Sequence, residues 1–551
     1  MKTLCTIFLS LFYFLLINIK VSAQEVPHPI QNNGIYEFLD ELANNQIISI
    51  NSTVKPYSRL FIAKCLEEAT GKIEELNARQ KKELEFYLRD FGKEKDIEGE
   101  KGSPDSYREG EEERFLWRRV KSTDRRDLFY YRDSLFSITI NPIFGGEVFH
   151  NAAGNATYWR NGLEARAYMG KWGFYASLRD NHEHPILGKS EYLTRREGGH
   201  LKGSTDWSEM IGGLTYSWKW GSAGLVKDGL EWGSNYNGAN IFGRRNPSFV
   251  HLRLHIKPVS WLDFNYFHGW LNSMVIDSSR SYYVTNSYGT DYREVYHSKF
   301  IAANIFTFTP VRYLNISAGN SIVYTDLKNF PGYLIPFLFF KSVDHSVNSG
   351  IDNMNSQMFF DVSSRQIKHL HLYATLFIDE LSVSRIFKDD QWNFVSWKAG
   401  FSLTDLPIEN LSFTTDYTYT YPLTYQHYVP TLTFESNRYN LGYYLRDNSR
   451  EWYVSFDYRP LRTMKISLWL LDAIRGPDYT ELGTPRVGNP PLKSVEWHNT
   501  SLGLKTSYQV INDLYAWGSF TISNIRGNQS WSPEFFYGKK NTINIGVSYG
   551  F

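Results

Sequence analysis

The sequence predicts an all-β transmembrane antiparallel barrel of about 18 strands with a small N-terminal α-helical domain. Three observations support this fold class. Strand-like segments with alternating apolar and polar residues follow one another over residues 130–551. Aromatic residues make up 17% of the chain although its mean hydropathy is −0.41, which fits aromatic girdles around a polar lumen. A short apolar run near the N-terminus has the pattern of a secretory signal.

Residues 1–23 are predicted to be a cleaved signal peptide. Lys2 supplies the positive charge, residues 4–19 are mainly apolar, and residues 21–23 have the small-residue pattern of a cleavage site. An uncleaved membrane anchor is the alternative, although the apolar run is short for a span. Cleavage removes Cys5 and leaves Cys65 alone. The mature chain then has no intramolecular disulfide, and Cys65 is expected to be a buried helix residue.

Residues 24–92 are predicted to form the helical domain. Apolar residues recur at helical spacing in three stretches, which begin near Ile35, Leu60 and Leu76. Ser58 is well placed to cap the second helix. An even-stranded barrel returns both of its ends to the periplasm, so we expect this domain on the periplasmic side. There, residues 33–91 are expected either to cap the barrel or to dock a periplasmic or outer-membrane protein partner.

Residues 93–129 differ from both neighbours because they are highly charged and contain few apolar residues. Such a composition predicts a solvated linker. Phe115, Leu116 and Trp117 are the exception, and they would allow part of the linker to anchor to a surface.

Residues 130–551 are predicted to be the outer-membrane barrel. Apolar residues on one face of each strand are expected to contact lipid, and charged residues such as Arg253, Asp457 and Lys465 alternate with them, which indicates water inside. About 18 strands leave roughly 23 residues for each strand and its connection, enough for short turns at one end and long loops at the other. The expected lipid-facing residues include Val250, Leu252, Leu254, Trp452, Val454, Phe456, Ile543, Ile545 and Val547.

The last strand has a distinctive ending. Its apolar face continues through Tyr549 to the terminal Phe551, with no polar tail. Such an ending is typical of the closing strand that the barrel-assembly machinery of bacterial outer membranes reads. We therefore predict that Tyr549 and Phe551 form a membrane-assembly signal. The alternative is the last strand of an ordinary soluble β-domain.

The sequence gives little support for catalysis. It has no nucleophile elbow, phosphate-binding loop or zinc-helix signature, so we predict no enzyme activity, no cofactor and no metal site. The triplet His182-Glu183-His184 is a weak metal candidate in a predicted loop. The net charge of +1, with no concentrated basic face, argues against a nucleic-acid partner.

The segment 226–258 contains the candidate binding residues. Trp232 and Tyr236 offer flat faces that can stack on sugar rings, and Arg244 and Arg245 can hold carboxylates or phosphates. Neighbouring glycines permit tight turns. The alternative is a structural turn folded into the barrel with Trp232 in packing. The aromatic-rich loop 275–296 is the next candidate for a binding site.

The same segment, read as K-x-x-x-x-WG-x-x-x-x-G followed by NPSF-x-HLRL, resembles the Wzi-type capsule-assembly outer-membrane proteins, in the version widespread in Bacteroidetes-like bacteria. The matching positions are Lys227, Trp232, Gly233, Gly238, Pro247, Ser248, Phe249, Leu252 and Leu254. The order of signal peptide, helical domain and barrel matches too. The resemblance implies an 18-stranded barrel with a periplasmic helical bundle, acting as a surface lectin that helps to anchor capsular polysaccharide.

The leading hypothesis is therefore a non-enzymatic outer-membrane barrel that binds capsular or exopolysaccharide and contacts outer-membrane lipid. Two alternatives use the same barrel. One is an open pore for small solutes, and the other is a subunit of a secretion or outer-membrane assembly complex that docks through its helical domain. An enzyme is the fourth hypothesis.

Overall fold

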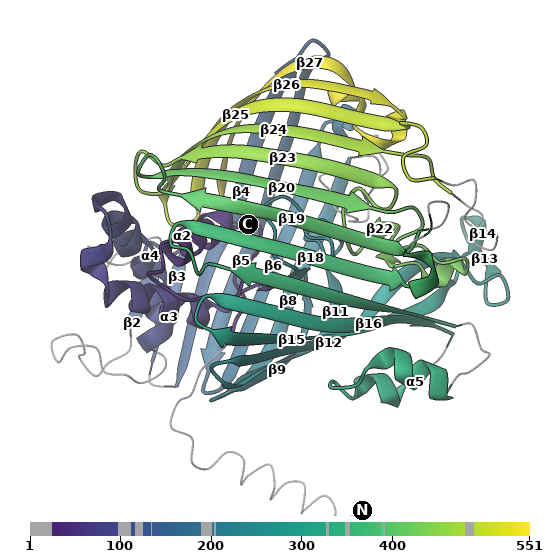
Figure 1. Ribbon diagram of the computed structural model, residues 1–551, viewed down its shortest axis with the longest axis horizontal. Helices are drawn as coiled ribbons and strands as arrows, with labels where there is room; N and C mark the ends of the chain where they lie inside the picture. Colours follow the sequence, from purple (N-terminus) through teal and green to yellow (C-terminus); the bar gives the residue numbers. More distant parts are fainter. Residues whose placement is uncertain are drawn as a thin grey trace, which may run out of the picture.

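The computed structural model of the chain describes residues 25–96, 112–115, 125–133, 135–188, 201–202, 205–326, 330–347, 353–386, 388, 392–479 and 490–550. A large barrel dominates the molecule, and a group of helices lies at one of its ends (Figure 1). The predicted signal peptide, most of the predicted linker and Phe551 lie outside the described residues. No helix among the described residues is long and apolar enough to cross a lipid bilayer.

The barrel is a closed antiparallel sheet of 18 strands, which confirms the predicted fold class. Each strand pairs with the next along the chain, and the ring closes where β27 pairs with β4. The barrel strands are β4 (Phe136–Asn151), β5 (Gly154–Met169), β6 (Trp172–Glu183), β8 (Asp206–Trp218), β9 (Gly221–Asp228), β11 (Phe249–Val259), β12 (Leu262–Ile276), β15 (Tyr296–Val311), β16 (Leu314–Thr325), β17 (Met354–Ser364), β18 (Leu370–Glu380), β19 (Phe394–Thr404), β20 (Leu411–Thr420), β23 (Ser449–Tyr458), β24 (Met464–Arg475), β25 (Trp497–Ile511), β26 (Leu514–Gly527) and β27 (Gly538–Tyr549).

Short pairings complete the sheet. β2 (Glu112–Phe115) pairs with β3 (Phe129–Arg132), β3 pairs with the first residues of β4, and β7 (Leu201–Lys202) pairs with β8. Among the described residues, three two-stranded sheets are separate from the barrel sheet, and their strands are β1 (Val54–Lys55) with β10 (Glu231–Trp232), β13 (Tyr282–Asn286) with β14 (Gly289–Arg293), and β21 (Glu435–Ser436) with β22 (Tyr439–Asn440).

Alternation along the strands separates an apolar outer wall from a polar lumen, because successive side chains of a strand point to opposite faces. Ile543, Ile545 and Val547 of β27 are exposed on the outer wall, as are Val250, Leu252, Trp452 and Phe456. Arg253, Asp457 and Lys465 alternate with these residues and face the lumen. The predicted assignment of the two faces therefore holds on β11, β23 and β27.

The two ends of the barrel differ in the length of their connections. Turns of a few residues, such as those between β5 and β6 and between β25 and β26, gather at one end, which we name the turn end. Most long connections, including 229–248, 277–295 and 421–448, leave from the opposite end, which we name the loop end. Tyr549, the last residue of β27, is also at the turn end, since Gly550 donates to the Asp513 carbonyl in the β25–β26 turn. Tyr549 stacks on Phe144, and their ring centroids are 5.5 Å apart.

The helical domain contains α2 (Asn33–Asn44), α3 (Arg59–Thr70) and α4 (Ala78–Asp96), as the three apolar repeats predict. The Ser58 hydroxyl accepts a hydrogen bond from the Phe61 amide at 3.1 Å, so Ser58 caps α3 as expected. Leu39, Leu42, Ile62, Leu66 and Leu84 are buried in a common core. α4 continues to Asp96, beyond the predicted boundary of the domain at residue 92.

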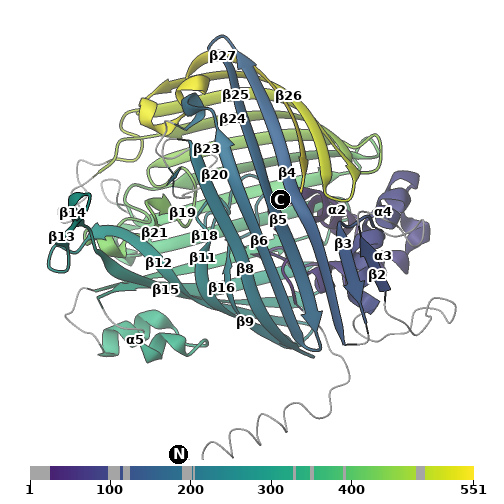
Figure 2. The ribbon, with the colours of Figure 1, turned by 180° about the vertical axis from the view of Figure 1, so that it is seen from behind.

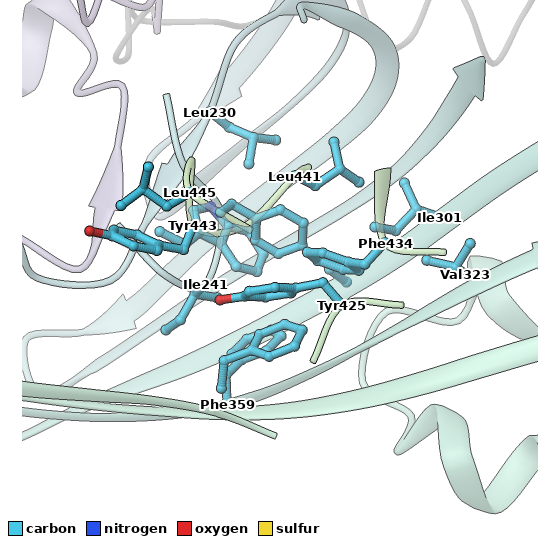
Figure 3. Packing of buried hydrophobic residues seen from close by; sticks show 14 of the residues in the cluster. Leu230, Ile241, Ile301, Val323, Phe359, Tyr425, Phe434, Leu441, Tyr443 and Leu445 are labelled. Atoms are coloured by element: carbon cyan, nitrogen blue, oxygen red, sulfur yellow. The ribbon is translucent and has the colours of Figure 1, made fainter. Parts of the chain in front are cut away.

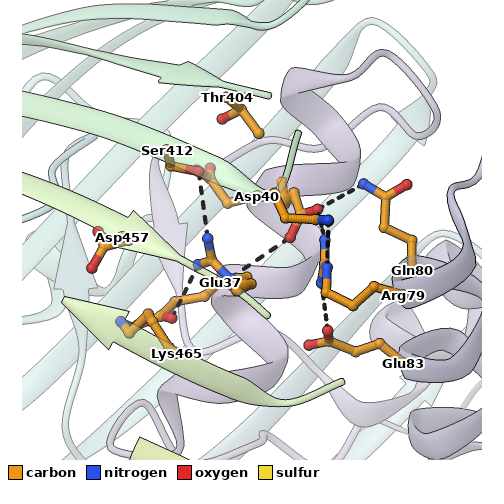
Figure 4. Close-up of polar contacts among 12 residues, drawn as sticks. Glu37, Asp40, Arg79, Gln80, Glu83, Thr404, Ser412, Asp457 and Lys465 are labelled. Carbon is orange, nitrogen blue, oxygen red and sulfur yellow. Dashed lines mark hydrogen bonds and ion pairs between the residues drawn. The ribbon is translucent and has the colours of Figure 1, made fainter. Parts of the chain in front are cut away.

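The helical domain is docked against the turn end through charged and polar contacts (Figure 4). Glu37 of α2 pairs with Arg459 at 3.3 Å and with Lys465 at 2.6 Å, both on barrel residues at this end. Arg365, which lies in the turn between β17 and β18, donates a hydrogen bond to the side-chain oxygen of Asn44 at 2.7 Å. Asn32 contacts Asp513 at 3.0 Å. Because these contacts come from widely separated turns, the domain covers a large part of the turn end (Figures 1 and 2).

Candidate functional site

The lumen holds a plug, which we define as the loop-end connections 229–248 and 421–448 together with residues 51–57 of the helical domain. Segments that enter from opposite ends of the barrel meet in this plug. Residues 51–57 enter from the turn end, and their strand β1 pairs with β10 of the connection 229–248, with Val54 opposite Trp232. The Gly233 amide extends the pairing by donating to the Thr53 carbonyl at 2.7 Å.

An apolar core joins the plug to the barrel wall (Figure 3). Ile241 and Phe242 of one connection and Phe434, Leu441 and Tyr443 of the other are fully buried there. The lumen-facing side chains Phe267, Ile301, Val323, Phe359 and Phe377 pack against them. A hydrophobic core inside the lumen explains why strands predicted to enclose water carry large apolar residues on their inner faces at these positions.

Trp232 lies at the centre of this core and is only 3% exposed. Its ring centroid is 5.2 Å from those of Phe242 and Phe267, and 6.0 Å from that of Phe359, all in edge-to-face arrangements. A ring so enclosed has no free face for a sugar. The proposal that Trp232 stacks on a ligand is therefore corrected, and the alternative in which it serves packing describes this residue.

A buried carboxylate clamps the turn beside Trp232 to the wall. Asp361 of β17 accepts hydrogen bonds from the Ser234 amide at 2.7 Å and from the Thr53 hydroxyl at 2.8 Å. Gly233 has φ +102°, a backbone conformation that residues with a side chain rarely adopt, which explains the glycine at this turn. Asp361 of the wall thus binds Thr53, next to β1, and Ser234, close to β10, and so holds both strands of the pairing.

Tyr236 is also engaged inside the barrel. Its hydroxyl donates to the Asp40 carboxylate of α2 and lies 2.9 Å from His371 Nδ1. Burial by itself raises the pKa of Asp40. The Arg365 guanidinium, together with His371, Lys55 and the hydrogen bond from Tyr236, outweighs burial and holds that pKa below its ordinary value. The ionised Asp40 is therefore a strong acceptor for Tyr236. Tyr236 contributes one edge to the chamber described next and links the plug to the helical domain.

The plug fills one side of the lumen and leaves a chamber of about 1030 Å³ on the other, against β4–β6 and β23–β27. α2 and α4 form its floor through Glu37 and Glu83, and Pro533 and Phe536 lie at its loop end. Hydroxyl and amide side chains of the strands make up much of the wall, among them Asn181, Thr414, Ser455, Ser467, Asn499, Ser501, Ser519, Thr521 and Asn544. Aromatic rings lie between them, including Tyr158, Tyr444, Tyr453, Trp469 and Trp517.

Basic side chains outnumber acidic ones in the lining of this chamber. Arg244 and Arg245 both reach it, and Arg244 also interacts electrostatically with Glu231 of β10. Arg244 donates to the Asn33 side-chain oxygen at 3.0 Å, and the Arg245 guanidinium lies over the Tyr444 ring at 4.2 Å. The basic lining residues are Arg160, Arg179, Arg244, Arg245, Arg459, Lys465 and Lys505, and the acidic ones are Glu37, Glu83, Glu147, Glu209 and Asp457.

The charge of the floor depends on Glu83. Burial raises the pKa of this carboxyl to about 7, although Arg79 beside it acts in the opposite direction. Near neutral pH this residue is therefore only partly ionised, which leaves the chamber more positive than the residue types alone suggest. Such a lining offers ring faces, hydrogen-bond partners and cationic groups to the same ligand.

The sequence predicts Arg244, Arg245 and Tyr236 as binding residues but does not predict the strand residues that complete the chamber. Arg160 and Arg179 could have been found, because each alternates with an outward apolar residue, Trp159 and Leu178 respectively. Asp361 had no comparable signal, since many acidic residues face the lumen.

The aromatic-rich loop 275–296 forms a projecting hairpin at the loop end (Figure 1). Tyr283 and Tyr292 face each other across β13 and β14, with ring centroids 5.0 Å apart, and Tyr288 at the tip is exposed. The base of the hairpin is held by Asp277, which accepts hydrogen bonds from Ser279 and Arg280. These hydrogen bonds hold the pKa of Asp277 below its ordinary value.

The triplet His182-Glu183-His184 does not form a loop cluster, because β6 continues through Glu183. His182 stacks on Trp159 of the outer wall at 3.8 Å between ring centroids, and His184 caps a short 3₁₀ turn by accepting from the Ile186 amide. Successive residues of a strand face opposite sides, so His182 and Glu183 do not converge on one ion. Among the described residues, no group of three or more His, Cys, Asp or Glu side chains is arranged to hold a metal ion.

Of the comparisons with known proteins, the one with solved structures bears on the fold. No protein-family model and no curated protein sequence matches the chain. Among solved structures, the chain is similar to Wzi of Escherichia coli, an outer-membrane protein involved in group 1 capsule assembly and described as a carbohydrate-binding β-barrel. The TM-score is 0.57 at 11% identity, covering 96% of this chain and 100% of Wzi.

Two further structures match less well. OccD3 of Pseudomonas aeruginosa has a TM-score of 0.41 at 11% identity and covers 75% of this chain and 90% of its own. OccAB2 of Acinetobacter baumannii has a TM-score of 0.41 at 10% identity, covering 75% and 97% respectively. At these levels of similarity the likeness to Wzi shows the fold alone, and the two Occ barrels carry no information about the function of this chain.

Proposed function

We propose that the protein is a non-enzymatic outer-membrane barrel that binds a cell-surface polysaccharide and helps to assemble or attach it. The observation that carries the proposal is the chamber of about 1030 Å³, closed towards the turn end by the helical domain and lined by rings, hydroxyls, amides and basic side chains. The likeness in fold to a barrel described as carbohydrate-binding supports the same conclusion.

The chamber has the chemistry that sugars require. Pyranose rings present hydroxyl groups around an apolar face, so they pair with hydroxyl and amide side chains and stack on aromatic rings. Trp469, Trp517 and Tyr453 provide rings in the chamber, in place of the buried Trp232. Arg244 and Arg245 are suited to carboxylate or phosphate groups, so we propose an acidic polysaccharide as the ligand.

The plug argues against the open pore. A diffusion pore needs a continuous aqueous path, whereas here the β1–β10 pairing and its apolar core occupy one side of the lumen and α2 and α4 form the floor of the other. In our proposal the turn end and the helical domain lie in the periplasm, and the loop end faces the cell exterior. The helical domain then acts first as a cap, and its outer surface remains available to a periplasmic or outer-membrane partner.

The proposal is tested by complementing a deletion strain. The double variant Arg244→Ala and Arg245→Ala should form a folded barrel, seen as heat-modifiable mobility on gels, but retain less polysaccharide on the cell. Arg253→Ala is the matched control, because Arg253 also faces the lumen but lies outside the chamber. Equal retention by the double variant and the wild type would reject the chamber as the binding site and direct attention to the tyrosine hairpin.

A further inference from the structure

One connection from the loop end takes an unexpected path. Residues 330–347, between β16 and β17, do not project from the barrel or enter its lumen. They lie against the outside of the wall, as the position of α5 (Phe340–Val347) in Figures 1 and 2 shows. We name residues 330–347 the strap.

The strap packs on the face of the wall that points away from the lumen. Strand register establishes this, because Phe359 and Val323 belong to the core inside the lumen whereas their neighbours Phe360 and Ile322 point the other way. The outward set on these strands includes Phe264, Tyr266, Ala302, Ile322 and Tyr324, and all five are buried in a cluster with Tyr333 and Phe340 of the strap. Phe337 also contacts Phe264, with 4.6 Å between ring centroids.

Beneath the strap the outer wall carries two amides that lipid alone could not satisfy. Asn304 and Asn320 face each other across β15 and β16, and the Asn320 amide donates to the Asn304 side-chain oxygen at 2.7 Å. The strap supplies the remaining partners. Asn304 donates to the carbonyls of Pro336 and Leu338 at 2.8 and 2.9 Å, and the Phe340 amide donates to Asn320 at 2.9 Å. Backbone and side-chain polar groups in a lipid-facing region need such internal partners.

The opposite face of the strap is apolar and open. Leu334, Ile335, Phe337 and Phe339 are 43%, 50%, 56% and 48% exposed. They continue the apolar outer surface of the same strands, where Phe308, Ile316, Phe360 and Val362 are exposed to a similar extent. The strap thus has an inner side whose amides are hydrogen-bonded and an apolar outer side that continues a lipid-facing surface. These are the properties of an element that lies in the plane of a membrane.

We propose that the strap is embedded in the outer leaflet and that its exposed face, formed by Leu334, Ile335, Phe337 and Phe339, binds lipid acyl chains. The barrel wall is then two layers thick over β12, β15 and β16, and the strap shields the Asn304–Asn320 pair from hydrocarbon. This inference depends on the barrel crossing a membrane and is independent of what the lumen binds.

Site-directed spin labelling of the full mature chain in phospholipid vesicles tests this proposal. A nitroxide is attached at Ile335→Cys in a Cys65→Ala background, and its collision rates with oxygen, which concentrates in lipid, and with a water-soluble nickel chelate are measured. Ile545→Cys on the exposed outer wall serves as the lipid reference, and Tyr288→Cys at the hairpin tip serves as the water reference.

The strap label should give an oxygen-to-nickel ratio several-fold above that of the Tyr288 label and close to that of the Ile545 label. A ratio like that at Tyr288 would overturn the proposal, as would shielding from both reagents, which would indicate a second protein copy on this face. If the Ile545 label also gives a ratio like that of the Tyr288 label, the barrel wall itself is not in lipid. This outcome rejects the membrane placement of the barrel and is distinguishable from a failure of the strap proposal alone.

A second variant tests the anchoring of the strap. Asn320→Ala removes the acceptor of the Phe340 amide and the donor to Asn304. The Ile335 label should become more mobile in this background while the barrel keeps its heat-modifiable mobility. An unchanged spectrum would show that the amide pair does not hold the strap in place.

Discussion

Replacing Trp232 with Ala should open the lumen without unfolding the barrel. Trp232 joins the β1–β10 pairing to the wall through Phe267 and Phe359 and packs on Phe242 of the plug, whereas the barrel ladder itself runs through other residues. Truncating a fully buried Trp costs about 3–5 kcal/mol. Because this loss falls on the plug, the ratio of closed to open plug should fall by roughly two to four powers of ten.

Ion conductance across planar bilayers measures this change directly. The wild type should conduct weakly, and Trp232→Ala should show frequent openings or a higher mean current. Trp452→Ala is the matched control, because Trp452 is exposed on the outer wall and should leave conductance unchanged. The reasoning is refuted if Trp232→Ala folds normally and conducts no more than the wild type, or if the wild type already conducts as an open pore.

Three further predictions concern assembly, chemistry and topology. Deleting Phe551 or changing it to Lys should lower the amount of barrel in the outer membrane. Export should not be blocked, because the change alters the terminal strand and leaves the signal peptide intact. Normal membrane levels of the truncated chain would reject the assembly signal. The Cys65 thiol is 4% exposed, and burial raises its pKa to about 12. At pH 8 it should therefore resist thiol reagents in the native protein and react once denaturant returns its pKa to an ordinary value. Rapid reaction of the folded protein would contradict the buried position. A cysteine at Glu74, whose side chain is highly exposed, should escape an impermeant reagent in intact cells and react after the outer membrane is permeabilised; labelling of intact cells would place the helical domain outside.

The barrel could be predicted from sequence because its signal is local. Because one face of each strand contacts lipid and the other faces a polar lumen, apolar and polar residues alternate along the strand. This alternation can be recognised within a single strand, without knowledge of its neighbours. The helical domain was equally accessible, since the apolar spacing before Asn44 and the cap at Ser58 are properties of adjacent residues.

The path of the connections could not be predicted in the same way. Glycine and asparagine around Trp232 indicate a turn, but whether it folds into the lumen depends on Asp361, more than 120 positions away in the chain. The candidate site was accordingly predicted only in part. Arg244 and Arg245 do reach the chamber, whereas Trp232 belongs to the core that shapes it. The strap did carry a local signal, because an apolar and aromatic run from Phe330 to Phe340 is unusual for an exposed loop.

Titration of purified polysaccharide against the purified protein in detergent tests whether the chamber binds an acidic polysaccharide. The ligand is acidic polysaccharide released from the surface of the producing cells, titrated against the wild type, Arg253→Ala and the double variant Arg244→Ala, Arg245→Ala. Each lost pairing is worth about 1 kcal/mol, so the double variant should bind roughly 30-fold more weakly while Arg253→Ala binds like the wild type. Failure of the wild type to bind any such polysaccharide would reject the proposed function, and equal affinity of the double variant would reject the chamber as the binding site.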